Sequence, residues 1–336
     1  MRPPLLLLAL LLLPAAAPPP AVPAYRAFGR WLVACDNTRS CVARGFDEVT
    51  RAQLELVRAA GPAAPRLSLS AEDPVDPAAL RLDGAPLPVA GWSRKENTLS
   101  TGDAAAVDAF VAVARNGRAI TLDAGPAKDD APRTVPLDGF TAALLFVDAV
   151  QGRSGTPTAL VASRGPAAVP PALPVPAAPS WSAPPPLSAA ERTRLTQVAA
   201  RLRSPIFEPC SSKEKPSVTA LDANNALAIR PCETAAYQGS AVVAVLPRAG
   251  GTEKPVKLAL PGLPRDATSG PDMVDPVFEA TTGTLFTSAK GRGPADCGSS
   301  AAWVWSNGAF RLKSLNFQEQ CGGTEPGDWP TLFRTR

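Results

Sequence analysis

The fold is decided by the stretch DCGSSAAWVWSNGAFRLKSLNFQEQCGGTEPGDWPTLFRTR, residues 296–336, at the C-terminal end of the chain. Two runs in it alternate apolar and polar residues, which is typical of strands whose side chains point to opposite faces. Between the runs stands Ser306-Asn307-Gly308, a turn signal for a hairpin. Cys297 precedes the hairpin and Cys321 follows it, so a disulfide can tie its ends. The stretch predicts a stapled antiparallel hairpin that closes a sheet.

The composition narrows the classes of function. The 336 residues allow two domains, 45% are hydrophobic, and 39 are proline. The net charge of +4 is mild and the basic residues are scattered, so we expect no nucleic-acid partner. The chain has no histidine, the commonest general base and metal ligand. We therefore expect no cofactor and no metal.

The N-terminus has the features of an export signal. Arg2 supplies a positive charge, residues 5–13 form an almost pure leucine run, and small residues end at Ala24. We predict a signal peptide at 1–24, cleaved after Ala24. An uncleaved anchor is the alternative, but the leucine run is short for a membrane span and no later stretch is long enough. After cleavage we expect no transmembrane segment.

The cysteine content fits an oxidising compartment. Six cysteines in an exported chain suggest three disulfides, and proximity favours three local bridges. None of the spacings is C-x-x-C, which argues against a redox or zinc motif, although free thiols and metal ligands stay open as alternatives. The favoured pairs are Cys35–Cys41, Cys210–Cys232 and Cys297–Cys321.

Residues 25–165 read as an N-terminal β-rich domain with two helices. Alternating runs predict strands, whereas residues 104–114 carry apolar side chains at helical spacing after a capping aspartate. Residues 137–150 predict a second buried helix, and Leu160-Val161 a short closing strand. The helices are expected to pack on the sheet.

Residues 166–186 are mostly proline and alanine, which favours an extended, semi-rigid linker. Residues 187–336 then predict a second domain. Ser188 and Glu191 form a capping box that opens a helix over 189–202, and the rest alternates as strands. The predicted fold is α+β and β-rich, with an antiparallel sheet and one or two packed helices in each domain.

These segments resemble a bacterial family called domain of unknown function 1176, over most of the mature chain. Four pieces carry the resemblance: WLVACDNTRSCVARGF at 31–46, the segment 137–160, Cys232–Tyr237, and the C-terminal GRGPADCG, WVW, GAFRL and DWPTLFRTR. The resemblance implies an exported, periplasmic protein of Gram-negative bacteria, and it implies no activity. The first half also resembles, more distantly, the invasion-associated locus B type of periplasmic protein, through its Trp-x-x-x-Cys start and its Gly-Phe-x-x-Ala-Leu helix.

Two motifs resemble functional sites without their required context. Residues 212–215 match S-x-x-K of penicillin-binding proteins, but the partner motifs S-D-N and K-T-G are missing. Residues 222–233 have an aspartate and a glutamate at the ends of a calcium-loop spacing. Ala226 and Leu227 stand where that loop needs an oxygen ligand and a glycine, and their surroundings alternate like a strand.

Carboxylates offer the remaining route to catalysis. Asp296, Glu319 and Asp328 lie in one disulfide-tied segment and could cluster as the pair that glycoside hydrolysis requires. Most of them are also explained as turn formers or caps. At another hairpin tip, Asp36-Asn37 and Arg39 could form a binding loop or could serve only as turn formers.

The aromatic end of the chain has two interpretations. Trp303 and Trp305 share one face of a strand, and we favour a core position for them. The alternative is an exposed ligand surface made by Trp303, Trp305, Arg311 and Lys313, suited to a glycan or a partner protein. Alternation counts against it, because the two basic residues point away from the face of Phe310.

The hypothesis for function is a non-enzymatic periplasmic binding or envelope-associated protein. It depends on the export signal, the absence of histidine and the failure of each catalytic motif. The expected partner is an envelope protein or a glycan. The alternative is a carboxylate-dependent hydrolase that acts on a cell-wall or glycan substrate.

Overall fold

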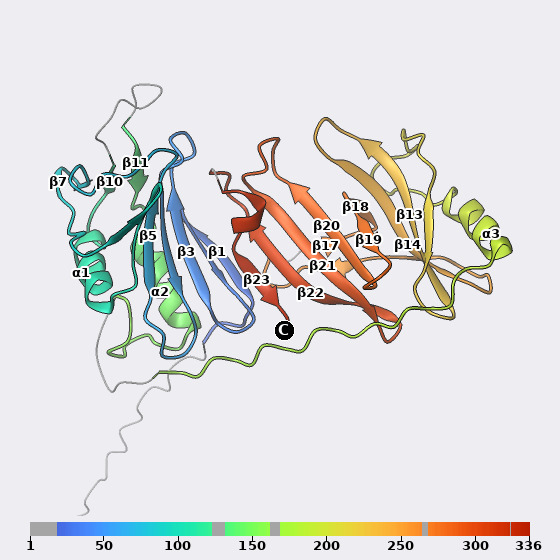
Figure 1. Cartoon of the computed structure of the whole chain (residues 1–336), viewed down its shortest axis with the longest axis horizontal. Coiled ribbons are helices and arrows are strands. Elements are labelled where there is room, and N and C mark those ends of the chain that lie inside the picture. The colour runs from blue at the N-terminus through green and yellow to red at the C-terminus, as the bar shows by residue number, and fades with distance from the viewer. Residues whose placement is uncertain (1–18, 123–131, 162–168, 264–267, 323) are drawn as a thin grey trace, which may run out of the picture.

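The computed structural model describes residues 19–122, 132–161, 169–263, 268–322 and 324–336. Three sheets follow one another along the long axis, with α1 and α2 beside the first sheet and α3 beyond the last (Figure 1). Most neighbouring strands are joined by short turns, and every strand pair within the described residues is antiparallel. This confirms the predicted β-rich α+β fold.

The first sheet has seven strands in the order β1-β2-β3-β4-β5-β9-β8. A smaller sheet beside it has the order β11-β10-β6-β7. The bounds of the first sheet are β1 Ala24–Phe28, β2 Trp31–Cys35, β3 Cys41–Phe46, β4 Gln53–Arg58, β5 Arg66–Ser70, β8 Ser93–Lys95 and β9 Thr98–Thr101. Those of the smaller sheet are β6 Arg81–Leu82, β7 Ala85–Pro86, β10 Ala119–Thr121 and β11 Thr134–Pro136.

Two helices, α1 (Ala104–Ala114) and α2 (Phe140–Val150), cover the apolar face of the first sheet. Trp31 lies 4.8 Å from the ring of Phe140, which in turn meets Phe110 edge to face at 6.5 Å. The prediction for α1 is confirmed over all its residues. The second helix begins three residues later than predicted, because Gly139 has a φ of 94° that no helix contains.

A buried ion pair ties α2 to the first sheet. Arg58 Nη1 of β4 lies 3.2 Å from Asp148 Oδ1, and the same carboxylate accepts the backbone N–H of Leu160 at 2.9 Å. Burial lowers the pKa of Arg58 to about 10 and raises the pKa of Asp148. The predicted strand at 160–161 is wrong, because these N–H groups bind a side chain rather than a neighbouring strand.

The central sheet, which contains the predicted hairpin, has the order β19-β20-β21-β22-β23. Its hairpin turn is confirmed, with positive φ at both Asn307 (50°) and Gly308 (76°), as a two-residue turn of type I′ requires. A bulge between Ala302 and Trp303 shifts the register. The bounds are β19 Val277–Glu279, β20 Thr284–Lys290, β21 Gly298–Ser306, β22 Ala309–Gln318 and β23 Thr331–Arg334, with the 3-10 turn η1 at Pro326–Asp328.

The third sheet has the order β12-β13-β14-β15, with β18 also paired to β14. One face packs on α3, whose Leu195 is buried in the core between helix and sheet. The other face packs on the central sheet, where Val243 of the third sheet and Leu285 of the central sheet belong to one core cluster. The bounds are β12 Ser217–Ala220, β13 Asn225–Thr234, β14 Gly239–Pro247, β15 Lys254–Pro255, β18 Asp272–Val274 and α3 Ala189–Ala199, with a separate pair β16 Leu258–Ala259 and β17 Thr268–Ser269.

The Pro/Ala-rich segment has no regular structure where it is described, from residue 169 onward, and it runs along one edge of the molecule past the C-terminus (Figure 1). It makes backbone hydrogen bonds to that end: Ala178 N–H donates to Arg336 O at 2.9 Å, and Arg336 N–H donates to Pro176 O at 3.0 Å. Its Trp181 donates to Leu221 O at 3.3 Å. The segment is therefore attached to the folded parts that it connects.

The structure pairs the six cysteines as proximity suggested, Cys35–Cys41, Cys210–Cys232 and Cys297–Cys321. The leucine run of the predicted signal peptide lies outside the described residues, and β1 begins at Ala24. Among the described helices, none has the length and apolar character needed to span a membrane.

A capped end fixes α3. Ser188 Oγ accepts from Glu191 N–H at 3.2 Å, Glu191 Oε2 accepts from Ser188 N–H at 2.8 Å, and Arg248 Nε lies 2.9 Å from Glu191 Oε1. The side-chain hydrogen bond from Arg248, followed by those from Ser188, lowers the pKa of Glu191 to about 2.

The pKa of Glu191 in the folded chain is below that of an unfolded glutamate. The ionised Glu191 therefore stabilises the folded state above pH 4.5, and this stabilisation is lost as the pH falls toward 2. We predict that Glu191→Gln lowers the melting temperature at pH 7 and that the difference from the native protein shrinks by pH 2.5. Melting curves at several pH values check this, with the exposed Glu253→Gln as control. A difference that does not change with pH would contradict the role of the charge.

Candidate functional site

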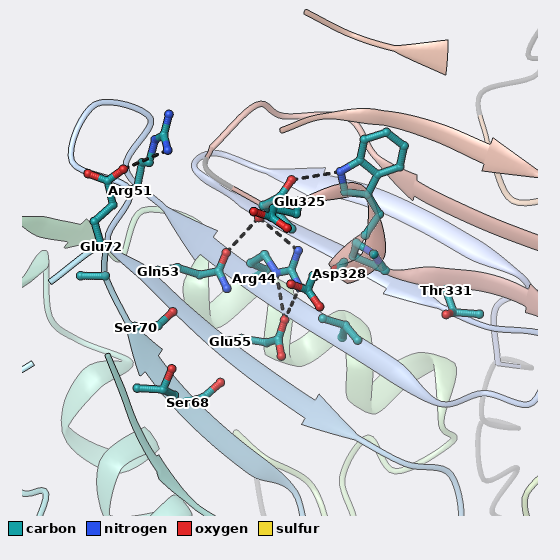
Figure 2. A pocket seen from close by; sticks show the side chains of 17 residues that line it. Arg44, Arg51, Gln53, Glu55, Ser68, Ser70, Glu72, Glu325, Asp328 and Thr331 are labelled. Carbon is teal, nitrogen blue, oxygen red and sulfur yellow. Dashed lines mark hydrogen bonds and ion pairs between the residues drawn. The ribbon is translucent and has the colours of Figure 1, made fainter. Parts of the chain in front are cut away.

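A polar groove of about 610 Å³ lies between the first sheet and the C-terminal segment that contains η1. Strands β3, β4, β5 and β9 form its floor, and residues 324–331 form a wall (Figure 2). It is lined by Val42, Arg44, Arg51, Gln53, Glu55, Ser68, Ser70, Ala71, Glu72, Thr98, Thr324, Glu325, Gly327, Asp328, Trp329, Pro330 and Thr331. We call it the polar groove.

Strand alternation makes the floor polar. In β4 and β5 the leucines point into the first core, so the residues between them point outward. The register places Glu55 opposite both Arg44 and Ser68, and Gln53 opposite Ser70. A row of polar side chains from neighbouring strands therefore faces the C-terminal segment.

Arg44 connects the floor to the wall. It is 4% exposed, and its Nε donates to Glu55 Oε2 at 2.9 Å. Its other nitrogens donate to Gln318 Oε1 at 3.1 Å, to Thr324 Oγ1 at 3.4 Å and to the Asp328 carbonyl at 3.1 Å. Figure 2 shows the guanidinium between Gln53, Glu55 and Asp328. One charged group thus satisfies acceptors on β4, β22 and η1.

Two further bonds fix the wall. Thr324 Oγ1 donates to Gln53 Oε1 at 3.1 Å, and the Thr324 carbonyl accepts from Trp329 Nε1 at 3.1 Å. The Trp329 ring is only 3% exposed. It serves to anchor the wall and does not offer a stacking surface.

The free groups of the polar groove are hydroxyls and carboxylates. In the described residues, no hydrogen bond engages the hydroxyls of Ser68, Ser70 and Thr98 or the carboxylates of Glu325 and Asp328. At the far end, the exposed Arg51 and Glu72 pair at 2.9 Å. The lining holds four carboxylates against two guanidinium groups, so its charge disfavours polyanions.

The family of the chain follows from comparison with known proteins. Residues 25–336 match the family model described as "Protein of unknown function (DUF1176)". The chain belongs to this family. It is 33% identical over 338 residues to "Uncharacterized protein YpfG" of Escherichia coli (strain K12), and the match covers 94% of each chain. No solved structure matches it.

In this DUF1176 chain, the two tryptophans of the alternative aromatic ligand surface are not exposed. Trp303 is 2% and Trp305 5% exposed, because Trp303 packs with Leu315 in the cluster that reaches the first sheet, and Trp305 packs against the third sheet. Arg311 is exposed and Lys313 half-buried. The two indoles are therefore core residues, as the favoured interpretation held.

The hairpin tip of the first sheet binds the chain's own C-terminal strand. Asp36 is 3% exposed, accepts from Thr38, and lies 2.8 Å from Arg334 Nε. Asn37 Nδ2 donates to Arg334 O at 3.1 Å, and Arg334 N–H donates to Asn37 Oδ1 at 3.0 Å. Asp36 and Asn37 thus join β2 and β3 to β23 and already have partners within the chain, whereas Arg39 Nε is buried without a hydrogen-bond partner among the described residues.

The three carboxylates proposed for catalysis do not meet in one groove. Asp296 is buried beside Arg292, with Oδ1 2.7 Å from Arg292 Nε. Glu319 is exposed and only Asp328 lines the polar groove. Asp296 also lies beside Cys297 and Cys321, but these two sulfurs are bonded to each other, so the group offers no thiolate ligand.

The two weak motifs have structural explanations. Ser212 lies in a loop and its N–H donates to Cys232 O at 2.9 Å. Asp222 forms a turn by accepting from Asn224 N–H at 2.7 Å, and it accepts from Trp305 Nε1 at 2.9 Å. Burial acts to raise the pKa of Asp222, but hydrogen bonds from Asn225, Asn224 and Trp305 outweigh it and lower that pKa.

Sequence reasoning missed the polar groove. Its partners Arg44 and Thr324 stand 280 positions apart, and nothing local marks either as part of a site. The available signal was the polar alternation in Gln53 and Glu55, and again in Ser68 and Ser70, which predicts that one face of the sheet is polar.

We predict that Arg44→Met lowers the free energy of unfolding by about 3–5 kcal/mol, because it leaves Glu55, Gln318 and the Asp328 carbonyl without their donor. Residues 319–331 should also become sensitive to protease. Arg51→Met is the matched control, since it removes an exposed pair worth less than about 1 kcal/mol. Denaturant unfolding of both variants makes the comparison, and equal small losses would contradict the role given to Arg44.

Proposed function

We propose that this chain is an exported binding protein that holds a hydroxyl-rich ligand of the glycan class in the polar groove. The observation that carries the proposal is the row of hydroxyls without intramolecular partners, Ser68, Ser70 and Thr98, which faces the carboxylates of Glu325 and Asp328. Sugar hydroxyls donate and accept hydrogen bonds, so they can satisfy both sets of groups. The volume of about 610 Å³ lies in the range of small-molecule sites.

The excess of carboxylates directs the choice of ligand. A neutral or amine-bearing glycan is compatible with four carboxylates and two guanidinium groups, whereas a sulfated or phosphorylated one is repelled. Cell-envelope glycans rich in N-acetylhexosamine meet this requirement.

Export to the periplasm is part of the proposal. The leucine-rich N-terminus supports a signal peptide cleaved after Ala24, and three disulfides support an oxidising compartment. We also infer a two-domain organisation divided at 166–186 and a distant relation of the first half to the invasion-associated locus B type. An envelope-associated role follows if the ligand is a cell-wall glycan.

Hydrolysis is the second candidate, because Glu55 on the floor and Asp328 on the wall line the same groove. Binding is favoured over hydrolysis, since Glu55 Oε2 accepts from Arg44 and so has a structural task. Incubation with oligosaccharides, followed by mass spectrometry of products, tests the hydrolase directly.

We predict that native protein binds a tetramer of β-1,4-linked N-acetylglucosamine in titration calorimetry. Replacing both Ser68 and Ser70 with alanine should weaken binding about tenfold, because each lost hydrogen bond contributes about 0.5–1.5 kcal/mol. Ser100→Ala is the control: it lies opposite Ser68 on β9 but does not line the groove.

A sulfated oligosaccharide of the same length should bind more weakly than the neutral tetramer. The proposal fails if no oligosaccharide binds, or if the serine double variant and Ser100→Ala bind equally well.

A further inference from the structure

A second pocket lies on the third sheet, where the turn between β13 and β14 and the neighbouring β18 meet the loop that follows α3. Its volume is about 380 Å³, and its walls are mostly apolar, although two carboxylates contribute to it. It is lined by Ile206, Phe207, Glu233, Thr234, Ala235, Gln238, Gly239, Ser240, Asp272 and Val274. None of these residues lines the polar groove.

Asp272 is the unusual member of this pocket. Both of its carboxylate oxygens are buried, and they have no hydrogen-bond partner among the described residues. The Ser240 hydroxyl is likewise buried without a partner. The register pairs Asp272 with Val242 and Val274 with Ser240, so alternation places Asp272 and Ser240 on the same face of the sheet. Two unsatisfied polar groups therefore share one side of one pocket.

A buried carboxylate without a partner is costly in free energy, and a cation placed beside it removes that cost. Among the described residues, no ion pair involves Asp272. Glu233, which also lines the pocket, adds a second negative charge while its own oxygens accept from Ser211. The electrostatics of the pocket thus favour a positive ligand.

The apolar wall of the pocket includes two exposed side chains on a loop that is fixed at both ends. Ile206 is 69% and Phe207 38% exposed, although both are large and hydrophobic. Their N–H groups donate to Ser204 Oγ at 3.0 and 2.6 Å, and the Cys210–Cys232 disulfide ties their loop to β13. Exposed apolar side chains on a fixed loop mark a binding surface.

We infer that this pocket binds the ammonium group of an aliphatic amine, with Asp272 as counter-ion, Ser240 as hydrogen-bond acceptor, and Ile206 and Phe207 against the carbon chain. Ca²⁺ or Mg²⁺ does not fit as well, because these ions need about six or more oxygen ligands and most of this lining is apolar. The inference is separate from the glycan groove, and either can fail without the other.

Titration of the full mature chain with n-hexylammonium tests the site, with 1-hexanol as the uncharged probe of the same chain length. We expect hexylammonium to bind at least tenfold more tightly than hexanol. Asp272→Asn should weaken hexylammonium binding at least tenfold, and Ser240→Ala should weaken it less. Glu279→Gln, which changes a carboxylate outside the pocket, should leave it unchanged.

Two further measurements accompany the titration: the melting temperature without ligand and binding of a second probe. Without ligand, Asp272→Asn should melt at or above the native temperature, because it removes an unpaired buried charge. An amide of Nα-acetyl-lysine, used as a second probe, distinguishes a lysine side chain of a peptide from a free amine as the source of the ammonium group. The inference is overturned if the native protein binds hexanol as tightly as hexylammonium, if it binds neither, or if a folded Asp272→Asn binds hexylammonium with unchanged affinity.

Discussion

The burial of one guanidinium group, that of Arg44, is the constraint on which the arrangement of the two halves depends. A charge that is 4% exposed must have its hydrogen bonds satisfied, and no single element of this fold can supply them all. Glu55 comes from the neighbouring strand, whereas Gln318 and the Asp328 carbonyl come from the C-terminal segment. The first sheet therefore keeps its polar partners only while that segment is in place.

The C-terminal segment accordingly has two tasks. Its hairpin forms the middle of the central sheet, and its last strand, β23, reaches the first sheet, where Arg334 pairs with Asp36 and Asn37. Arg336 also pairs with the Pro/Ala-rich segment, so three distant parts of the sequence meet at this end. The polar groove lies beside this junction, and the second pocket lies on a different sheet.

Local patterns predicted the elements and did not predict the sites. The Asn307-Gly308 turn and the helix at 104–114 depend on neighbours in sequence, so they could be predicted from it. Asp36 looked like a turn former and is one, but its partner Arg334 lies 298 positions away. The groove combines Arg44 with residues 324–331, and the unpaired state of Asp272 is visible only once β18 is placed beside β14. These features arise from packing between residues that are far apart in the sequence. No local pattern in a single sequence identifies such pairs.

Amide hydrogen exchange of the native protein tests the central claim most directly, by comparing residues 324–334 with β3 and β4. If Arg44 and the hairpin tip hold the C-terminal segment to the first sheet, its hydrogen-bonded amides, such as Arg334 N–H, should be protected to nearly the same degree as those strands. Exchange of residues 324–334 that is orders of magnitude faster, while β3 and β4 stay protected, would contradict the account.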